Sequence, residues 1–319
     1  MPLWLSESDV RAALSLEELI GAMERALAAF SAGKVDQPVR TVMELRDRTF
    51  FGLMPAYHRE DAVLGAKLVS VIAENAGRSL PTHLAAISLF DPETGELSAV
   101  MDGRYITELR TAAVSAVSVR HLARKDAVVA AILGSGVQAR SHVAALRLVR
   151  NFAEIRAWSP TELHLRAFAE ECGIVASPSA AEALRAADVI VLATSMTTPA
   201  IESAWVDDGA HVISIGACRP SQRELDPRLI ARSRFVVDSR AAAYVESGDV
   251  VLGIREGRFS REHVSAELGE IAGGRAPGRS ADREITVFKS LGLAIEDVTA
   301  AALAYRRARE MRRGTKVGL

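Results

Sequence analysis

The chain has 319 residues, enough for two ordinary domains, and 49% of them are hydrophobic, so a large core can be buried. Its 39 basic and 40 acidic residues nearly cancel, which argues against a strongly basic surface and against nucleic acid as the main partner. Two cysteines, Cys172 and Cys218, make no disulfide framework and fit a reducing cytosol.

The N-terminal sequence MPLWLSESDV has no basic region followed by a long apolar core, so we do not expect a signal peptide. The longest apolar runs elsewhere are interrupted well short of a membrane span. We therefore expect a cytoplasmic protein with no membrane partner. Ser15 precedes LEELIGAMERALAAF, where apolar residues recur at helical spacing, which predicts a helix.

Strand-like segments follow this helix: RTVMEL, TFFGLMPAY, LGAKLVSVI and HLAAISLFD. The runs ISLFD and LSAVMD are joined by PETGE, a turn with Pro and Gly, and predict an antiparallel hairpin. The first 115 residues therefore predict an α+β domain with antiparallel strands.

From about Asp126 short, branched, apolar runs alternate with alanine-rich helical stretches. The runs are AVVAAIL, EIRAW, DVIVLAT, HVISIG and RFVVDS, with helical stretches such as VQARSHVAALRLVR and SAAEALRAA. This alternation predicts a doubly wound parallel sheet with helices on both faces, in a domain over residues 116–293.

The last segment, VFKSLGLAIEDVTAAALAYRRARE, predicts a long amphipathic helix with a basic end. We expect its apolar face to pack on the first region. Residues from about 294 to 319 would then complete the domain of residues 1–115, which becomes discontinuous in sequence.

The stretch ILGSGVQARSH carries the most specific signal. Gly134 and Gly136 follow a predicted strand and open a predicted helix, as in the G-x-G-x-x-G/A turn that binds a dinucleotide. In that turn the first glycine permits the bend, the second lets the backbone approach a pyrophosphate, and Ala139 occupies the third position. An ordinary tight strand-to-helix turn is the alternative, and the flanking pattern favours the dinucleotide.

The choice between NAD and NADP depends on the end of the next strand, which reads AWSPT. Enzymes that use NAD usually carry Asp or Glu about 20 residues after the glycine turn. Ser159, Pro160 and Thr161 stand there instead, so the extra phosphate of NADP would be tolerated. Arg156 and Arg166 are close in sequence, and NADP is weakly favoured.

Several stretches together resemble the ornithine cyclodeaminase/mu-crystallin family, from about Arg40 to the last helix. They are GSGVQA, AVMDGRYITELRTAAVSA, GACRPSQRELD, VESGDVVLG and TVFKSLGLAIEDVTAA. The resemblance implies a Rossmann-type domain plus a second domain that contributes an antiparallel sheet to a homodimer. It also implies a nicotinamide cofactor, NAD or NADP, and a small amino-acid-like substrate.

The resemblance implies catalytic and substrate-binding roles for Arg40 and Lys67. Arg40 matches an arginine that holds the substrate carboxylate, which a planar guanidinium can bind bidentately. Lys67 lies inside an apolar strand that has no other charge, and a dry pocket lowers the pKa of an ammonium so that it can exchange protons with an imine nitrogen. The resemblance also implies that Arg110 binds the pyrophosphate or the substrate, and that Arg219 adds a positive charge near the substrate carboxylate. A surface arginine and a snorkelling lysine are the alternatives for Arg40 and Lys67.

Cofactor contacts are implied at the glycine turn, at the carboxyl ends of sheet strands and in two other stretches. The residues are Thr82, Arg110, Thr111, Gly134, Ser135, Gly136, Val137, Gln138, Ser159, Thr161, Thr194, Ile215, Gly216, Lys289 and Ser290. Among them Lys289 and Ser290 match residues that reach the nicotinamide region, although a plain helix-opening loop is the alternative. His83 is a weak acid–base candidate. No histidine or cysteine spacing predicts a metal site.

The stretch GACRPSQREL departs from the cyclodeaminase pattern. In cyclodeaminases the corresponding loop has a pattern like G-D-x-P-G-K, and its aspartate is the base that activates water. Aligned on Pro220, that position holds Cys218, which cannot replace a carboxylate base. The loop resembles the mu-crystallin branch of the family instead. That resemblance implies that the protein reduces ketimines.

We therefore predict an NAD(P)H-dependent reductase of cyclic ketimine carboxylates such as pyrroline- or piperideine-2-carboxylate. An ornithine cyclodeaminase or amino-acid dehydrogenase with an altered base is the first alternative. A cofactor-loaded binding protein for a small carboxylate, with little turnover, is the second. The central expectation is that backbone amides around residues 134–138 bind the diphosphate of the cofactor, so that its nicotinamide ring faces a positively lined cavity made by Arg40 and Lys67.

Overall fold

The chain divides into two units in the computed structural model, which describes residues 1–46, 49–78 and 80–318. The mixed-sheet unit comprises Met1–Arg110 and Leu293–Leu319, and the parallel-sheet unit comprises Thr111–Gly292. The division falls inside helix α3 (Arg104–Leu122), a few residues before the boundary that we expect from the sequence.

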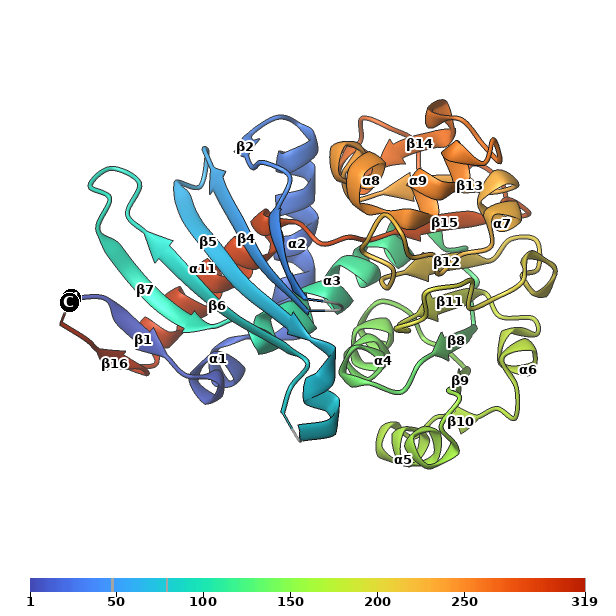
Figure 1. The fold of residues 1–319 in the computed structure, drawn as a ribbon, viewed down its shortest axis with the longest axis horizontal. Coiled ribbons are helices and arrows are strands. Elements are labelled where there is room, and N and C mark those ends of the chain that lie inside the picture. Colours follow the sequence, from blue (N-terminus) through green and yellow to red (C-terminus); the bar gives the residue numbers. More distant parts are fainter. Residues whose placement is uncertain (47–48, 79, 319) are drawn as a thin grey trace. The chain divides into compact units, whose positions relative to one another are not determined.

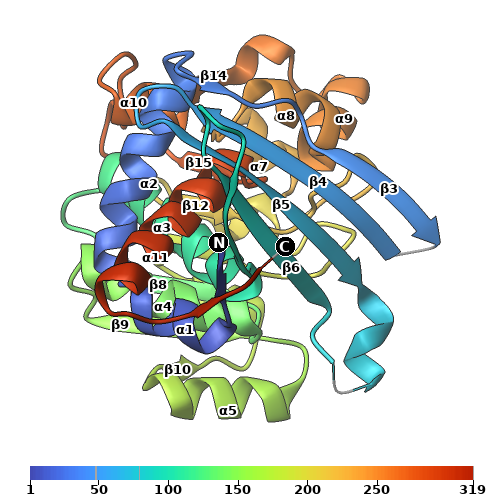
Figure 2. The same cartoon turned by 90° about the vertical axis from the view of Figure 1, so that its left-hand side faces the viewer.

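A sheet of eight described strands forms the centre of the mixed-sheet unit (Figures 1 and 2). The order is β16-β1-β7-β6-β5-β4-β2, with β3 paired to β4, and among these strands only β1 and β7 run parallel. The bounds are β1 (Leu3–Leu5), β2 (Val35–Asp36), β3 (Thr41–Arg46), β4 (Thr49–His58), β5 (Val63–Ile72), β6 (His83–Phe90), β7 (Leu97–Asp102) and β16 (Thr315–Lys316). The predicted hairpin is confirmed, because β6 and β7 pair antiparallel.

Two helices, α2 (Leu16–Ser31) and α11 (Ala294–Glu310), pack together, and α11 lies against β4, β5 and β6. The closeness of α11 to the sheet explains Gly65 on β5, where an added Cβ would meet the Ser88 carbonyl at 2.7 Å and the Val298 side chain at 3.2 Å. The remaining helices of this unit are α1 (Glu7–Ala13), the start of α3, and the 3-10 turn η1 (Ala73–Arg78).

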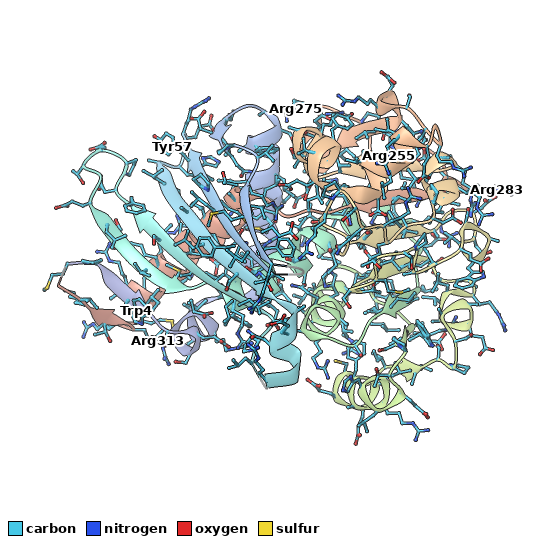
Figure 3. All side chains as sticks on the ribbon, in the orientation of Figure 1. Trp4, Tyr57, Arg255, Arg275, Arg283 and Arg313 are labelled. Atoms are coloured by element: carbon cyan, nitrogen blue, oxygen red, sulfur yellow. The ribbon has the colours of Figure 1, made fainter. Side chains whose placement is uncertain are left out.

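The C-terminal segment corrects one prediction. The residues TVFK form strand β15 (Thr286–Lys289) of the parallel-sheet unit, and the helix begins only at Ala294. Pairing between parallel strands overrides the apparent helical spacing there. The helix also ends at Glu310, and β16 then pairs with β1 so that Trp4 lies opposite Thr315 (Figure 3, where Trp4 and Arg313 are labelled).

The parallel-sheet unit contains the predicted alternation of strands and helices. Its described strands follow the order β10-β9-β8-β11-β12-β15-β13-β14, and every neighbouring pair is parallel. The bounds are β8 (Val129–Leu133), β9 (Glu154–Trp158), β10 (Val175–Ala176), β11 (Val189–Leu192), β12 (His211–Ser214), β13 (Arg234–Val237), β14 (Val264–Glu267) and β15.

Both faces of this sheet are buried, as a parallel sheet requires. All four residues of β11, which alternate between the two faces, are fully buried. The helices are α4 (Val137–Val149), α5 (Glu162–Cys172), α6 (Ala180–Leu184), α7 (Pro227–Ala231), α8 (Arg240–Glu246), α9 (Gly248–Arg255) and α10 (Leu268–Ala272), with 3-10 turns η2 (Ser203–Trp205) and η3 (Arg261–His263). The predicted Rossmann-type α/β fold is confirmed. Within the described ranges, no helix combines the length and apolarity needed to cross a membrane.

Candidate active site

The glycine turn follows β8 with the backbone shape that a dinucleotide site needs. Gly134 has φ of +117°, and a Cβ there would lie 2.3 Å from the Ala193 carbonyl oxygen, so two independent reasons require glycine. Its amide donates to the Trp158 carbonyl at 2.9 Å, which ties the turn to the neighbouring strand.

The N-terminus of α4 is open to an anion. Gly136 is the N-cap, no side chain caps the helix, and an added Cβ at Gly136 would meet nothing within 4 Å. The first turn of α4 carries no acidic residue, so its amide groups and helix dipole attract a negative group. Ala139 is fully buried, in keeping with a residue that lets the helix lie close to its strand. These features fit a pyrophosphate.

The region of the predicted ribose contact contains hydroxyl groups and no carboxylate. Ser135 Oγ donates to Ser159 Oγ at 2.9 Å, and Thr161 is the N-cap of α5. Arg156 donates to Glu154 and to the Arg185 carbonyl, and Arg166 pairs with Glu162, so both are engaged elsewhere.

The arginine that contacts the turn is Arg140, which the sequence reasoning did not single out. Its guanidinium donates to the Ser135 carbonyl at 2.5 Å and to Glu171 at 2.7 Å. The signal was present, because Arg140 lies one helical turn after Gly136 in the same motif.

A second cluster lies at the carboxyl ends of β11 and β12. Thr194 and Gly216, both predicted from the resemblance, donate their backbone amides to the buried carboxylate of Glu224. Lys289 is fully buried and forms an ion pair with Asp249 at 3.2 Å. Ser290 is also buried and donates to Asp238 at 3.4 Å.

The sequence reasoning missed the three carboxylates Glu224, Asp249 and Asp238. Glu224 lies in a loop and Asp249 in α9, whereas Asp238 directly follows β13, and each becomes a partner only through packing. The Lys289 ammonium is therefore held inside its own unit by carboxylate and hydroxyl partners.

The loop after β12 carries Cys218 at its exposed tip. Its Sγ lies 3.6 Å from the Ile215 carbonyl. Ala217, just before it, has φ of +51°, a left-handed conformation that costs a non-glycine residue about 1 kcal/mol or more. Arg219 follows in the same loop and is partly buried.

The mixed-sheet unit brings Lys67 into a buried charge cluster. Lys67 Nζ lies 2.5 Å from Asp297 Oδ2 and 3.5 Å from Thr107 Oγ1. Arg110 donates to Asp297 at 3.0 Å and to Glu296 at 2.7 Å. Lys67 is 1% exposed and both carboxylates are 0% exposed. Strand β5 has no other charged residue, so the ion-pair partner of Lys67 is Asp297, which lies in the first turn of α11.

The pKa of Lys67 is lowered to about 8, chiefly by burial. Asp297 opposes this shift, while the charges of Arg110 and Arg40 add to it. A dry pocket is expected to shift the pKa of a lysine in this direction. The two cations keep the pKa of Asp297 below its usual range against the effect of burial, so Asp297 stays ionised at neutral pH.

Two other predicted residues of this unit, His83 and Arg40, interact electrostatically with the same cluster. His83 opens β6, and burial followed by the charges of Lys67 and Arg110 lowers its pKa to about 4, so its ring is neutral at neutral pH. Arg40 precedes β3 and is close enough to influence Lys67. Thr82 is exposed, and its carbonyl accepts from the Ile72 amide. Thr111 is buried in α3 and belongs to the parallel-sheet unit.

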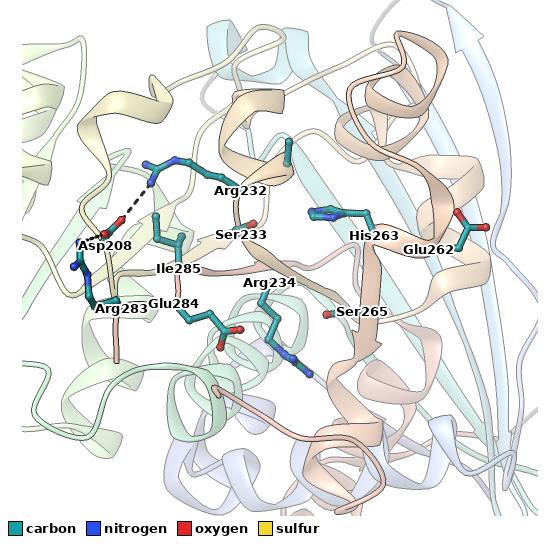
Figure 4. Close-up of a pocket in the computed structure, with 11 residues that line it drawn as sticks. Asp208, Arg232, Ser233, Arg234, Glu262, His263, Ser265, Arg283, Glu284 and Ile285 are labelled. Carbon is teal, nitrogen blue, oxygen red and sulfur yellow. Dashed lines mark hydrogen bonds and ion pairs between the residues drawn. The ribbon is translucent and has the colours of Figure 1, made fainter. Parts of the chain in front are cut away.

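A surface pocket of about 660 Å³ lies elsewhere on the parallel-sheet unit (Figure 4). Arg234, Ser265 and Ile285 line it, and they stand at the amino ends of β13, β14 and β15. Ligands of open parallel sheets bind at the opposite, carboxyl edge. Its charged groups also pair among themselves, as Asp208 does with Arg232 and Arg283, so we do not assign the reaction to this pocket.

The chain is similar to several known proteins over almost its whole length. The ornithine cyclodeaminase/mu-crystallin family model matches residues 2–312. The ketimine reductase mu-crystallin of Rattus norvegicus is 42% identical over 311 residues, which are 95% of this chain and 96% of the rat protein. The structure of Thermococcus litoralis Delta(1)-pyrroline-2-carboxylate reductase in complex with NADH and L-proline has a TM-score of 0.96 at 39% identity, covering 99% of this chain and 100% of that chain. An archaeal alanine dehydrogenase dimer with bound NAD has a TM-score of 0.95 at 34% identity, over 99% of each chain. The chain belongs to the ornithine cyclodeaminase/mu-crystallin family.

Proposed function

We propose that the protein is an NAD(P)H-dependent reductase of small cyclic ketimine carboxylates, of the pyrroline- or piperideine-2-carboxylate type. The observation that carries the proposal is the buried Lys67–Asp297 pair, whose lysine has a pKa of about 8. A lysine in this state can hold or deliver a proton near neutral pH, which is what an imine nitrogen requires when its carbon is reduced. The rat and Thermococcus relatives, both reductases by name, support the same reaction.

The parallel-sheet unit would hold the cofactor. Gly134 and Gly136 would admit the pyrophosphate, and the open N-terminus of α4 would face it. When bound, the reduced nicotinamide supplies the hydride that adds to the imine carbon.

The mixed-sheet unit would hold the substrate. In our proposal Arg40 binds the carboxylate and Lys67 supplies the proton that ends on nitrogen. Asp297 orients the Lys67 ammonium and keeps it protonated, since the carboxylate raises the lysine pKa against burial. Arg110 holds Asp297 and Glu296 in place, which is a role different from the direct contact with pyrophosphate or substrate that the resemblance implied.

The loop at Cys218 argues against cyclodeamination. Ammonia release and ring closure need a base at the reacting carbon, and a thiol is a poor substitute for a carboxylate. A single hydride transfer to a preformed C=N bond does not need that base. Amino-acid dehydrogenation is the second candidate, because the archaeal alanine dehydrogenase matches almost the whole chain.

A substrate panel tests the proposal. Purified protein is mixed with NADPH or NADH and piperideine-2-carboxylate, and the absorbance of the reduced cofactor is followed. The expected result is rapid cofactor oxidation with the cyclic imine, no ammonia from ornithine, and slow oxidation with pyruvate plus ammonia. Rapid turnover of pyruvate plus ammonia would favour the dehydrogenase, and cofactor binding without turnover would favour a binding protein.

The cofactor preference is a further part of the proposal. The hydroxyl pair Ser135–Ser159 offers hydrogen bonds without a carboxylate that would repel a 2′-phosphate. We therefore expect NADPH to be accepted, with a lower KM than NADH. A lower KM for NADH would contradict this preference.

We also propose a homodimer formed through the exposed face of the mixed sheet. Met43, Leu53, Leu68 and Leu84 share that face by strand register, and they are 39–53% exposed. A contiguous apolar face of this kind favours association, and the archaeal relative is described as a dimer.

The dimer gives a first prediction. Leu53→Lys combined with Leu68→Lys places two charges at directly opposed positions on β4 and β5. We expect the purified variant to be monomeric by light scattering, whereas Leu163→Lys, at an exposed site on α5, remains dimeric. A dimeric double variant would contradict the assigned interface.

A further inference from the structure

Glu224 is a fully buried carboxylate with four hydrogen-bond donors. Its Oε1 accepts from Thr194 N at 3.1 Å and Thr194 Oγ1 at 2.6 Å, and its Oε2 accepts from Ser214 Oγ at 2.7 Å and Gly216 N at 2.9 Å. The pKa of Glu224 is raised, because burial outweighs the opposing effects of Lys289 and the hydroxyl donors. Four donors suit the ionised form, which only accepts hydrogen bonds.

Lys289 is the counter-ion of this carboxylate cluster. Its ammonium donates to Ser214 Oγ at 3.0 Å and to the Gly216 carbonyl, and it lies 3.2 Å from Asp249 Oδ2. Asp249 in turn accepts from the backbone amides of Glu224 and Leu225, both at 2.8 Å. The cluster thus contains two carboxylates and one ammonium, all fully or almost fully buried.

The network holds the backbone after β12 from both sides. The Gly216 amide is bound by Glu224 and its carbonyl by Lys289, just before the left-handed Ala217. A Cβ on Gly216 would lie 2.5 Å from the Thr194 carbonyl and 2.6 Å from Glu224. Loop 215–219, which carries Cys218 and Arg219, is therefore fixed by buried charge.

The same carboxylate is linked to the glycine turn through the peptide between Ala193 and Thr194. Because a trans peptide points its C=O and N–H in opposite directions, the Thr194 amide that faces Glu224 directs the Ala193 carbonyl away from it. That carbonyl is the group that leaves room only for glycine at position 134. Glu224 thus links the shapes of two neighbouring strand ends at the carboxyl edge.

We propose that Glu224, with Lys289 as its counter-ion, is a positioning residue that fixes Thr194 and loop 215–219 in the shape needed to seat the nicotinamide half of the cofactor. This inference rests on the proposed function. In this proposal Lys289 acts on the cofactor indirectly, through Glu224, rather than by the direct contact that the resemblance implied. The pair does more than stabilise the fold.

Glu224→Gln is the informative variant. The amide keeps one acceptor oxygen and turns its NH₂ toward donors, so at least one backbone amide loses its partner. The change leaves Asp249 and Lys289 as a neutral pair, so electrostatic destabilisation is small. We expect kcat to fall by about 10²-fold, as a misplacement of about 1 Å can cause. The NADH dissociation constant, measured by fluorescence without imine, should rise about tenfold, while the imine KM changes little.

Glu284→Gln is the matched control, because Glu284 also accepts two hydrogen bonds, both from Ser280, but lies next to the amino end of the same strand β15. It should behave as the wild type in kcat and NADH affinity. The wild-type protein is measured first, and a wild type that neither binds NADH nor reduces the imine would refute the proposed function rather than this inference.

Two further variants separate positioning from folding. Lys289→Met leaves two buried carboxylates without a cation and should lower Tm strongly. The double variant Lys289→Met/Glu224→Gln keeps only the Asp249 carboxylate, so the cluster has the same net charge as in the wild type. Its Tm should therefore recover in part. We expect kcat and NADH affinity to stay low in this double variant.

Three results would overturn the proposal. They are wild-type kcat and NADH affinity in Glu224→Gln, recovery of kcat together with Tm in the double variant, and a loss in Glu224→Gln confined to the imine KM. If Glu224→Gln does not fold, Ser214→Ala, which removes one donor to the same carboxylate, replaces it with the same outcomes.

Discussion

Each unit of this protein buries one lysine beside carboxylates, and the two lysines differ in pKa. Lys67 in the mixed-sheet unit has a pKa lowered to about 8, because burial and the charges of Arg110 and Arg40 outweigh Asp297. Burial also acts against the charged form of Lys289 in the parallel-sheet unit, yet Asp249, Cys218 and Glu224 raise its pKa above the ordinary value.

The balance of neighbouring charge therefore decides what a buried lysine can do. Cationic neighbours leave Lys67 able to release a proton near neutral pH, whereas carboxylates keep Lys289 protonated as a fixed counter-ion. Burial alone would have suggested the same role for both residues.

The largest expected effect is on kcat, which should depend on Lys67 as the proton donor. Lys67→Met should lower kcat by about 10²- to 10⁴-fold, because the proton donor is lost. NADH affinity should change less than about twofold, since the cofactor turn lies in the other unit. Steady-state kinetics and cofactor titration measure both quantities, with Lys125→Met at an exposed position as the control. Equal losses in kcat and NADH affinity would contradict the assigned role.

The free energy of unfolding should fall more when Lys289 is replaced than when Lys67 is replaced. Lys289→Met should cost about 3–5 kcal/mol of unfolding free energy, because two buried carboxylates lose their ammonium partner. Lys67→Met should cost less, because Arg110 still binds both Asp297 and Glu296. Denaturant unfolding of the two variants side by side tests this order, and a larger loss in Lys67→Met would reverse the comparison.

The pH profile sharpens the assignment of Lys67. If its protonated form is required, kcat should fall as pH rises through about 8. Asp297 raises the pKa of Lys67, so Asp297→Asn should lower that pKa further. We expect the alkaline fall of kcat to move by about one pH unit toward acid. An unmoved or oppositely moved profile would argue against proton transfer by Lys67.

The smallest effect concerns buried histidines of the parallel-sheet unit. Burial lowers the pKa of His142 to about 4 and that of His211 to about 3, so both are neutral when folded. The unfolded chain binds protons below about pH 6.5, so stability should fall as pH drops from there toward 4.

Each of these histidines should contribute at most about 1.4 kcal/mol per pH unit to that loss. His211→Gln should therefore flatten the dependence of unfolding free energy on pH, while His164→Gln on the exposed face of α5 should not. Identical slopes in the two variants would refute this account.

Much of the fold follows from local pattern. Alternating apolar runs and the turn PETGE predict the β6–β7 hairpin, and branched runs between alanine-rich stretches predict the parallel sheet. The stretch from Val287 was misread, because a strand of four residues with a short apolar run cannot be told from the start of a helix by its pattern.

In the candidate site, too, residues with a local sequence signature were predictable, and partners brought in by packing were not. Gly134 and Gly136 were predictable, because a tight turn and a close backbone approach leave a local signature. Lys67 was predictable as an unusual charge in an apolar strand, and its carboxylate partner was not. Glu224 looked like one of many charged residues in a loop, and only packing shows that it receives four hydrogen bonds.

The sequence by itself determined the two types of sheet, the glycine turn and the identity of the charged residues, because these depend on spacing over a few neighbouring positions. Only the tertiary structure decided which charges meet. Arg110 and Asp297 are 187 positions apart, and Lys289 and Ser214 are 75 apart. The physical reason is that a buried ion is stabilised by whichever group the packing of distant elements places within a few ångströms, and no local pattern records that choice.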